Sequence, residues 1–128
     1  MTEKTTILLV DDDLDFLESQ KQLLVAAGYD VHTACTGKEG VEKAKSLHPH
    51  LILLDVMMPG MDGFEVLKKL KENVKTASIP VIMLTAKADD ESKMRAAGLY
   101  GDDYLIKPVE FKTLKARIDS VLESKGLK

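Results

Sequence analysis

The sequence has 128 residues, of which 45% are hydrophobic and 30% charged, and its formal net charge is −3. This length suits one domain with its own core, and the single cysteine, Cys35, excludes a disulfide framework. The mild acidity argues against a protein that binds the phosphate backbone of nucleic acid. No apolar run approaches the roughly 18 residues of a membrane span, and the polar residues 1–6 do not form a signal peptide. We therefore expect one cytoplasmic domain over residues 1–128, with a loose tail at residues 124–128.

The first half of the chain alternates two strand patterns with two helix patterns. A continuous aliphatic run at residues 7–10 predicts a strand that is covered on both faces. The next apolar positions predict a helix that Gly28 ends, with one face formed by Phe16, Leu23, Leu24 and Ala27. Residues 30–35 predict a weaker strand, and Thr36 followed by Glu39 is a capping-box pattern at the start of a second helix.

The second half continues this alternation. Apolar runs at residues 51–54 and 81–84 predict two more buried strands, and residues 104–106 predict a fifth. Residues 62–65 resemble a helix start, whereas residues 89–98 carry only a faint helical pattern. The last helix has the clearest spacing, with apolar residues at three- and four-residue steps: Phe111, Leu114, Ile118, Val121 and Leu122.

Strand and helix thus alternate about five times, at roughly 20–25 residues per unit, which is typical of α/β proteins with a parallel sheet. Five strands in a chain of this length favour a doubly wound, flavodoxin-like sheet of order 2-1-3-4-5 with helices on both faces. Ligands of such sheets bind beyond the carboxyl ends of the strands, so we expect the chemistry of this protein there.

Charged and polar residues stand at four of these carboxyl ends. Asp11 and Asp12 follow the first strand, Asp55 the third, Thr85 the fourth and Lys107 the fifth. Two unit charges about 4 Å apart interact by about 4 kcal/mol at an effective dielectric constant near 20, so three neighbouring carboxylates need more positive charge than one lysine supplies. Mg²⁺ fits this need, because it binds one or two carboxylates and leaves positions for water and phosphate oxygens.

These strand ends resemble the receiver domain of bacterial two-component response regulators, and the resemblance covers essentially the whole chain. The matching segments are residues 7–13, 53–63, 81–86 and 101–108. The resemblance implies that Asp55 is the phosphoacceptor, that Asp12 binds Mg²⁺ directly and that Asp11 binds it through water. The backbone carbonyl of Met57 is implied as a further metal ligand.

The same resemblance implies roles for residues around the phosphoacceptor. Thr85 and Lys107 are expected to contact phosphoryl oxygens, and Lys107 is expected to precede Pro108 through a cis peptide bond. Phosphorylation is expected to draw Thr85 inward and to turn Tyr104 toward the space that Thr85 leaves. Met57 and Lys87 occupy the two positions that set the lifetime of the phosphoryl group in this family.

The implied partners are a sensor histidine kinase or a histidine phosphotransfer protein, together with a downstream protein target or an effector domain outside this chain. Direct contact with nucleic acid or membrane is not expected, and the protein is expected to be a monomer or a weak, phosphorylation-dependent dimer. It is not expected to be an enzyme, beyond catalysing its own phosphorylation and dephosphorylation.

Two other functions are open to this sequence. One is a Mg²⁺-dependent phosphohydrolase of the haloacid-dehalogenase type, with Asp11 as nucleophile, Asp13 as second acid, and Thr85 and Lys107 in supporting roles. Against it, Leu14 follows the second acid and no cap segment is present. Asp13 is also expected to cap the first helix, as an acidic residue at that position often does. The other function is a receiver fold that serves as a binding module without phosphorylation.

Overall fold

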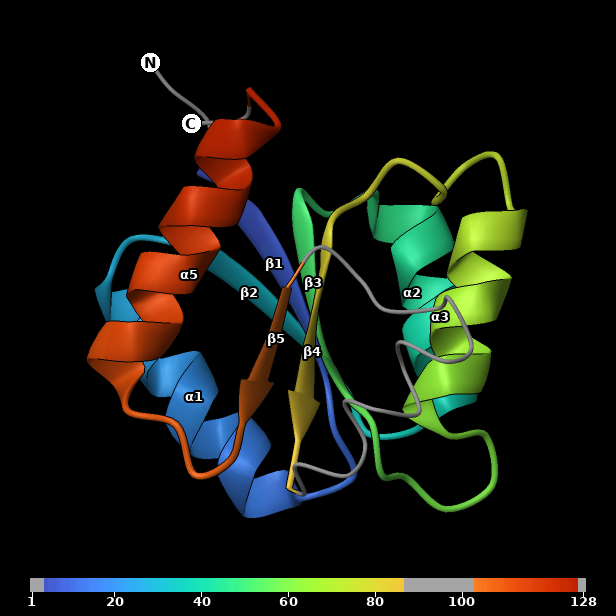
Figure 1. The fold of residues 1–128 in the computed structure, drawn as a ribbon, viewed down its shortest axis with the longest axis horizontal. Helices are drawn as coiled ribbons and strands as arrows, with labels where there is room; N and C mark the ends of the chain where they lie inside the picture. The colour runs from blue at the N-terminus through green and yellow to red at the C-terminus, as the bar shows by residue number, and fades with distance from the viewer. Residues whose placement is uncertain (1–3, 87–102, 127–128) are drawn as a thin grey trace.

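The structure, a computed structural model, describes residues 4–86 and 103–126 (Figure 1). Its five strands form one parallel sheet of order β2-β1-β3-β4-β5, which confirms the predicted fold class and strand order. The strands are β1 (Thr6–Val10), β2 (Asp30–Ala34), β3 (Leu51–Asp55), β4 (Val81–Thr85) and β5 (Asp103–Ile106). The described helices are α1 (Leu14–Ala26), α2 (Gly37–Leu47), α3 (Gly63–Glu72) and α5 (Phe111–Ser124).

Helices cover both faces of the sheet, and the aliphatic runs allow one strand to pack apolar side chains against the helices on each face. Side chains of a strand alternate between its faces. Leu8 and Val10 of β1 pack in the cluster that includes α2 and α3, whereas Ile7 and Leu9 pack in the cluster that includes α1 and α5. The two pairs of helices lie on opposite sides of the sheet (Figure 1). A run without polar residues is therefore what a central strand of this sheet requires.

The buried face of α1 differs from the predicted one. Its buried residues are Leu17, Gln20 and Leu24, whereas Leu23 is exposed and Ala27 is the exposed C-terminal cap. Neighbouring helix residues point about 100° apart, so Leu23 and Leu24 cannot both lie at the centre of one face. Leu24 lies there because Leu17, two turns earlier, extends the same stripe.

Two predicted helix boundaries depend on local hydrogen bonds. Gly28, with a φ of +101°, ends α1 as expected, and the N–H groups of Gly28 and Tyr29 donate to the carbonyls of Val25 and Leu24. At the start of α2, Thr36 accepts a hydrogen bond from the N–H of Glu39 at 3.1 Å.

The capping pattern at α2 differs in one detail from the expected box. The Glu39 carboxylate accepts from the N–H of Cys35 at 2.8 Å, one residue before the cap. Cys35 is exposed and lies outside β2, so the predicted strand over residues 30–35 is one residue too long. The Cys35 N–H bonds to this carboxylate instead of extending the strand.

The C-terminal part of the described chain has two boundary differences. β5 begins at Asp103, one residue earlier than expected, and Asp103 forms a two-bond ion pair with Arg117 of α5 at 3.0 and 2.8 Å. α5 continues through Ser124, the first residue of the tail that the sequence predicts. The faint helical pattern at residues 89–98 lies outside the described residues. Within the described residues, no helix has the length and apolar character that a membrane span needs.

Candidate functional site

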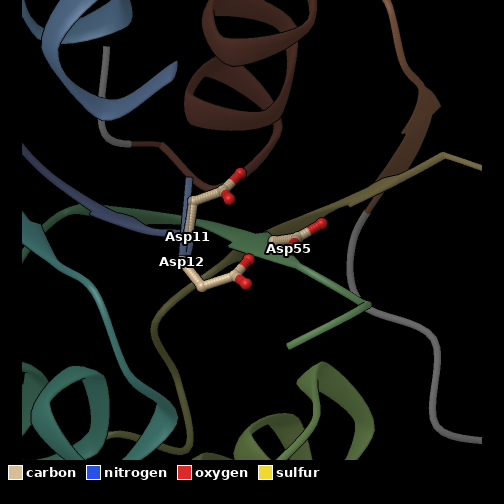
Figure 2. A group of neighbouring side chains, drawn as sticks. All are labelled: Asp11, Asp12 and Asp55. Carbon is tan, nitrogen blue, oxygen red and sulfur yellow. The ribbon is translucent and has the colours of Figure 1, made fainter. Parts of the chain in front are cut away.

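Three aspartates meet at the carboxyl end of the sheet, where β1 and β3 lie side by side. Asp11 follows the last residue of β1, Asp12 comes next, and Asp55 is the last residue of β3. Their side chains extend toward one space beyond the strand ends (Figure 2), and carboxylate oxygens from all three lie within 4.8 Å of one another. Asp11 and Asp55 are only 1% and 4% exposed, whereas Asp12 is exposed. The structure thus brings together the three carboxylates that the strand ends predict to be neighbours.

The backbone after β1 holds Asp11 in a fixed orientation. Its N–H donates to the carbonyl of Ala34 at 3.0 Å, which continues the ladder with β2. Its Oδ1 accepts from the N–H of Asp13 at 3.0 Å. Asp13 in turn caps α1, because its Oδ1 accepts from the N–H groups of Asp15 and Phe16 at 3.1 Å each. The chain therefore turns from β1 into α1 through three side-chain-to-backbone hydrogen bonds, of which Asp11 accepts one and Asp13 accepts two.

A glycine lets α3 begin close to the end of β3. The N–H of Gly63 donates to the carbonyl of Val56 at 2.8 Å. A Cβ atom on Gly63 would lie 2.4 Å from the carbonyl oxygen of Asp55 and 2.7 Å from the Cα of Val56. Any larger residue would therefore push this loop away from Asp55. The sequence predicts a helix start over residues 62–65 but does not reveal this close approach.

Lys107, one residue beyond the end of β5, supplies the positive charge at the site. Its Nζ lies 2.6 Å from Asp11 Oδ2 and 3.4 Å from Asp55 Oδ1. Its N–H donates to the carbonyl of Thr85 at 2.6 Å, and the following peptide bond to Pro108 is cis, as expected. The Nζ also lies 4.3 Å from the centre of the Phe16 ring, which is a cation–π contact. No motif in the sequence predicts this contact.

Burial and charge shift the protonation equilibria of the site. Burial, followed by the negative charge of Asp11, raises the pKa of Asp55 from its ordinary value of 3.8 to about 6, although Lys107 acts in the opposite direction. Burial alone would lower the pKa of Lys107, but its hydrogen bond to Asp11 and the charges of Asp11 and Asp55 raise it above the ordinary value. Both shifts mark an excess of negative charge in a poorly solvated space.

The donor set fits a hard divalent cation. Three carboxylates and one ammonium leave a net charge of about −2 at neutral pH, and every candidate ligand atom is an oxygen, as Mg²⁺ prefers. Asp11, Asp12 and Asp55 could hold the ion, while the Lys107 ammonium neutralises part of the charge through its contact with Asp11 Oδ2. The arrangement therefore combines clustered carboxylates with a neighbouring ammonium group, the kind of set in which a carboxylate can act as a nucleophile while cations stabilise negative charge.

The remaining predicted residues surround this centre. Thr85 is fully buried at the end of β4, where it pairs with Ile106 of β5. The side chain of Met57 is 54% exposed in the loop after β3. Tyr104 in β5 is partly buried against the cluster on the α2 and α3 side of the sheet. Lys87 lies outside the described residues.

The dehalogenase-type alternative finds no support at this site. It assigns Asp13 the role of second acid, but the Asp13 carboxylate accepts two backbone hydrogen bonds as the cap of α1. A carboxylate in that position serves the helix end and lies outside the group of three that share one space.

Comparisons with known proteins place the chain in a family. A family model described as the response regulator receiver domain matches residues 7–119. The DNA-binding dual master transcriptional regulator RpaA of Synechocystis sp. is 40% identical over 116 residues, which cover 91% of this chain and 48% of RpaA. The alkaline phosphatase synthesis transcriptional regulatory protein PhoP of Bacillus subtilis shows the same identity and coverage.

A solved structure gives the same result at the level of the fold. The CheY-like response regulator receiver domain protein of Methanospirillum hungatei JF-1 is 34% identical, with a TM-score of 0.87, and the match covers 97% of this chain and 98% of that one. The chain spans about half the length of the curated relatives that it matches. This protein belongs to the response regulator receiver domain family.

Proposed function

We propose that this chain accepts a phosphoryl group on Asp55, with Mg²⁺ bound by the neighbouring aspartates, and that it relays a signal from a partner kinase. The observation that carries the proposal is the position of Asp55. It ends a buried strand, shares a space with Asp11 and Asp12, and lies 3.4 Å from the Lys107 ammonium. This is a carboxylate nucleophile surrounded by groups suited to phosphoryl oxygens.

The transfer moves one phosphoryl group between two covalent partners. An oxygen of the ionised Asp55 carboxylate attacks the phosphorus of a phosphohistidine on the partner protein. The P–N bond breaks, the imidazole leaves and takes up a proton from solvent, and an acyl phosphate forms on Asp55. Because the pKa of Asp55 is about 6, most of this carboxylate is ionised at neutral pH.

The other residues stabilise charge during this transfer. Bound Mg²⁺, held by Asp11, Asp12, Asp55 and the carbonyl of Met57, would neutralise negative charge on the phosphoryl oxygens. Lys107 contributes an ammonium group that stays protonated because its pKa is raised. It is held between Asp11 and Asp55 and therefore needs little movement to reach a phosphoryl oxygen. Positioning and charge neutralisation are the main requirements of phosphoryl transfer.

The output in this proposal is a change of surface around β5. The phosphoryl group draws the hydroxyl of Thr85 toward Asp55, and Tyr104 moves into the space that Thr85 leaves. Both residues are partly or fully buried at adjacent strands, so a shift of one changes the packing of the other. Reversing a 1:99 equilibrium to 99:1 requires a difference of about 5.5 kcal/mol in the affinity of the two states for the phosphoryl group.

The proposed partners follow from the chemistry of this site. The donor is a sensor histidine kinase or a histidine phosphotransfer protein, because the chain itself supplies only the acceptor. The target is a downstream protein or an effector domain, and the named transcriptional regulators among the relatives favour control of transcription through such a domain. The single domain over residues 1–128 acts in the cytoplasm, as a monomer or a weak phosphorylation-dependent dimer, and turns over no external substrate.

Incubation with Mg²⁺ and a small acyl-phosphate donor, followed by intact mass measurement, tests this proposal. We expect one added phosphoryl group on the wild-type chain and none on Asp55→Asn. The matched control is Asp15→Asn, which removes an exposed carboxylate in the first turn of α1 and should leave phosphorylation unchanged. Sustained release of phosphate from small phosphomonoesters, abolished by Asp11→Asn, would instead support a phosphohydrolase.

The lifetime of the phosphoryl group provides a second test. Met57 is exposed beside Asp55 and has no group that could orient an attacking water. We expect the acyl phosphate to be long-lived and Met57→Asn to hydrolyse it several times faster, with Lys87 as the second position that affects the rate. The measurement is the decay of phosphorylated protein after the donor is removed, and equal rates for both proteins would contradict the role of Met57.

A further inference from the structure

A hollow lies at the amino ends of the strands, at the opposite end of the sheet from the aspartates. It has a volume of about 620 Å³ and is formed by the loops after α2 and α3 and by the end of α5. In Figure 1 these segments lie at the top of the view, away from the arrowheads of β4 and β5. Its volume lies within the range of about 300 to 1,000 Å³ that is typical of sites for small ligands.

Basic side chains dominate the lining of this hollow. Among the described residues, five basic ones and no acidic one contribute to it: His48, His50, Lys71, Lys75 and Lys125. This composition is unusual for a chain with a net charge of −3. Basic side chains therefore gather around this hollow, at the opposite end of the sheet from the clustered aspartates.

The negative C-terminal ends of three helices offset part of the positive charge around the hollow. α2, α3 and α5 each end beside the hollow, and a helix C-terminus carries about half a negative charge. Three such ends amount to roughly −1.5, whereas the three lysines supply three positive charges. The three lysines thus carry more charge than the helix dipoles alone would offset, and no acidic side chain is among the described residues that line the hollow.

The walls of the hollow are held in place by contacts within the chain. Lys71 Nζ donates to the carbonyls of Ala77 and Ile79 at 3.3 Å each, which fixes the loop before β4. His50 Nδ1 accepts from the N–H of Thr6 at 2.9 Å, so the ring proton of the neutral imidazole lies on Nε2 as a possible donor. Lys71 and His50 therefore shape the site.

Lys75 differs from Lys71 because its charge is not used within the described part of the chain. Its backbone N–H donates to Asn73 Oδ1 at 2.9 Å, which orders the turn after α3. Its Nζ has neither a carboxylate nor a carbonyl partner among the described residues, although it lines the hollow. An ammonium group in this position is available to a bound anion.

We propose that this hollow binds a small anion that carries several negative charges, such as a polyphosphate. Lysines bind phosphate groups as point charges, and several of them around one hollow favour a multiply charged ligand over a monovalent one. A nucleic acid would need an extended basic face, which a chain of net charge −3 does not supply. The size and the charge of the hollow thus define the ligand class.

A titration with inorganic pyrophosphate, followed by amide chemical shifts of the labelled full chain without Mg²⁺, tests this proposal. Omitting Mg²⁺ makes the result independent of the aspartate site. We expect saturable chemical-shift changes at residues 48–50 and 75–79. The affinity for pyrophosphate should also fall as the salt concentration rises from about 50 to about 200 mM, because this rise shortens the screening length roughly twofold. Orthophosphate should bind about tenfold more weakly, because it carries fewer charges.

Variants on two sides of the hollow sharpen the test. Lys75→Gln should weaken pyrophosphate binding about fivefold, and Lys75→Gln with Lys125→Gln about twentyfold, since each removes one charge contact. Lys68 is an exposed lysine of α3 that does not line the hollow, so Lys68→Gln should change the affinity for pyrophosphate less than about twofold. The proposal is overturned if no saturable shift occurs, if shifts centre on Asp55 and Lys107, or if Lys68→Gln weakens binding as much as Lys75→Gln.

Discussion

The two ends of the sheet both gather charge, but they hold it in different ways. At the carboxyl end, Asp11 and Asp55 are almost completely buried and share one lysine, Lys107, which is itself only 19% exposed. At the amino end, Lys71, Lys75 and Lys125 are exposed around an open hollow. Buried charges interact strongly and are costly when left unpaired, whereas exposed ones are screened by water. The carboxyl end should therefore control stability as well as chemistry, whereas an exposed lysine such as Lys75 at the amino end should affect binding and leave stability nearly unchanged.

The largest stability effect is expected at Lys107. Lys107→Met keeps the bulk of the side chain but leaves two buried carboxylates without their ammonium partner. Removing one partner of a buried ion pair costs about 3 to 5 kcal/mol, so the free energy of unfolding should fall by about 4 kcal/mol. Urea unfolding at pH 8 without Mg²⁺ measures it. A loss below 1 kcal/mol would show that the aspartates are solvated well enough to do without Lys107.

The second-largest effect is expected for Asp55→Asn, which should raise the free energy of unfolding by an amount that depends on pH. Burial and Asp11 raise the pKa of Asp55 to about 6, so the folded protein binds this proton more tightly than the unfolded chain does. The resulting stability is complete below pH 4 and is lost as the pH rises through about 6. Asp55→Asn has no carboxyl group to ionise and therefore does not lose this stability. At pH 8 its free energy of unfolding should exceed that of the metal-free wild type by up to about 3 kcal/mol.

Urea unfolding of wild type and Asp55→Asn between pH 4 and pH 8 measures that difference. It should be small at pH 4 and grow mainly between pH 5 and pH 7. A difference that does not vary with pH would mean that the Asp55 charge is not the cause, and would contradict the electrostatic description of the carboxyl end.

A smaller loss is expected at Gly63, which tests how tightly the same end is packed. A Cβ at this position meets the Asp55 carbonyl and Val56 backbone, a clash of about 3 kcal/mol that the better helix propensity of Ala reduces by about 1. Gly63→Ala should therefore lower the free energy of unfolding by about 2 kcal/mol and slow phosphorylation. Gly60→Ala is the control, because it meets no atom within 4 Å and is limited to the strain of its φ of +78°.

Phosphorylation distinguishes these two glycine variants more sharply than stability does. Gly63→Ala displaces the backbone of Asp55, whereas Gly60→Ala leaves it in place. Equal rates of phosphorylation for both variants would contradict the idea that the α3 start positions Asp55.

The smallest effect is expected at the amino end. Lys75→Met removes an exposed ammonium that has no partner among the described residues, so the free energy of unfolding should change by less than about 0.5 kcal/mol. The comparison with Lys107→Met, the same substitution at the other end, is made under identical conditions. Similar losses for the two variants would remove the contrast between the ends of the sheet.

Much of this architecture could be predicted because the relevant signals are local. Uninterrupted runs such as residues 7–10 and 51–54 indicate strands buried on both faces, and five strands in a chain of this length favour the strand order that is observed. The carboxyl ends of parallel strands then meet at one edge, which is why the sequence predicts that Asp11, Asp12 and Asp55 lie together.

Other features could not be predicted, because they depend on how distant segments pack. The contact of Phe16 with Lys107 joins α1 to the end of β5, and no periodicity relates these two residues. The buried face of α1 is ambiguous in a sequence with Leu23 and Leu24 adjacent. The Asp103–Arg117 ion pair and the hydrogen bond between Thr6 and His50 likewise require the final register of the strands.

The most direct test of the central claim is to locate the phosphoryl group on the chain. Wild-type protein is treated with Mg²⁺ and an acyl-phosphate donor, the acyl phosphate is reduced with borohydride, and the modified residue is identified by peptide mass spectrometry. Reduction of an aspartyl phosphate converts that aspartate to homoserine. We predict homoserine at position 55 alone, and none in Asp55→Asn. Homoserine at Asp11 or Asp12, or unmodified Asp55 in a phosphorylated chain, would contradict the account.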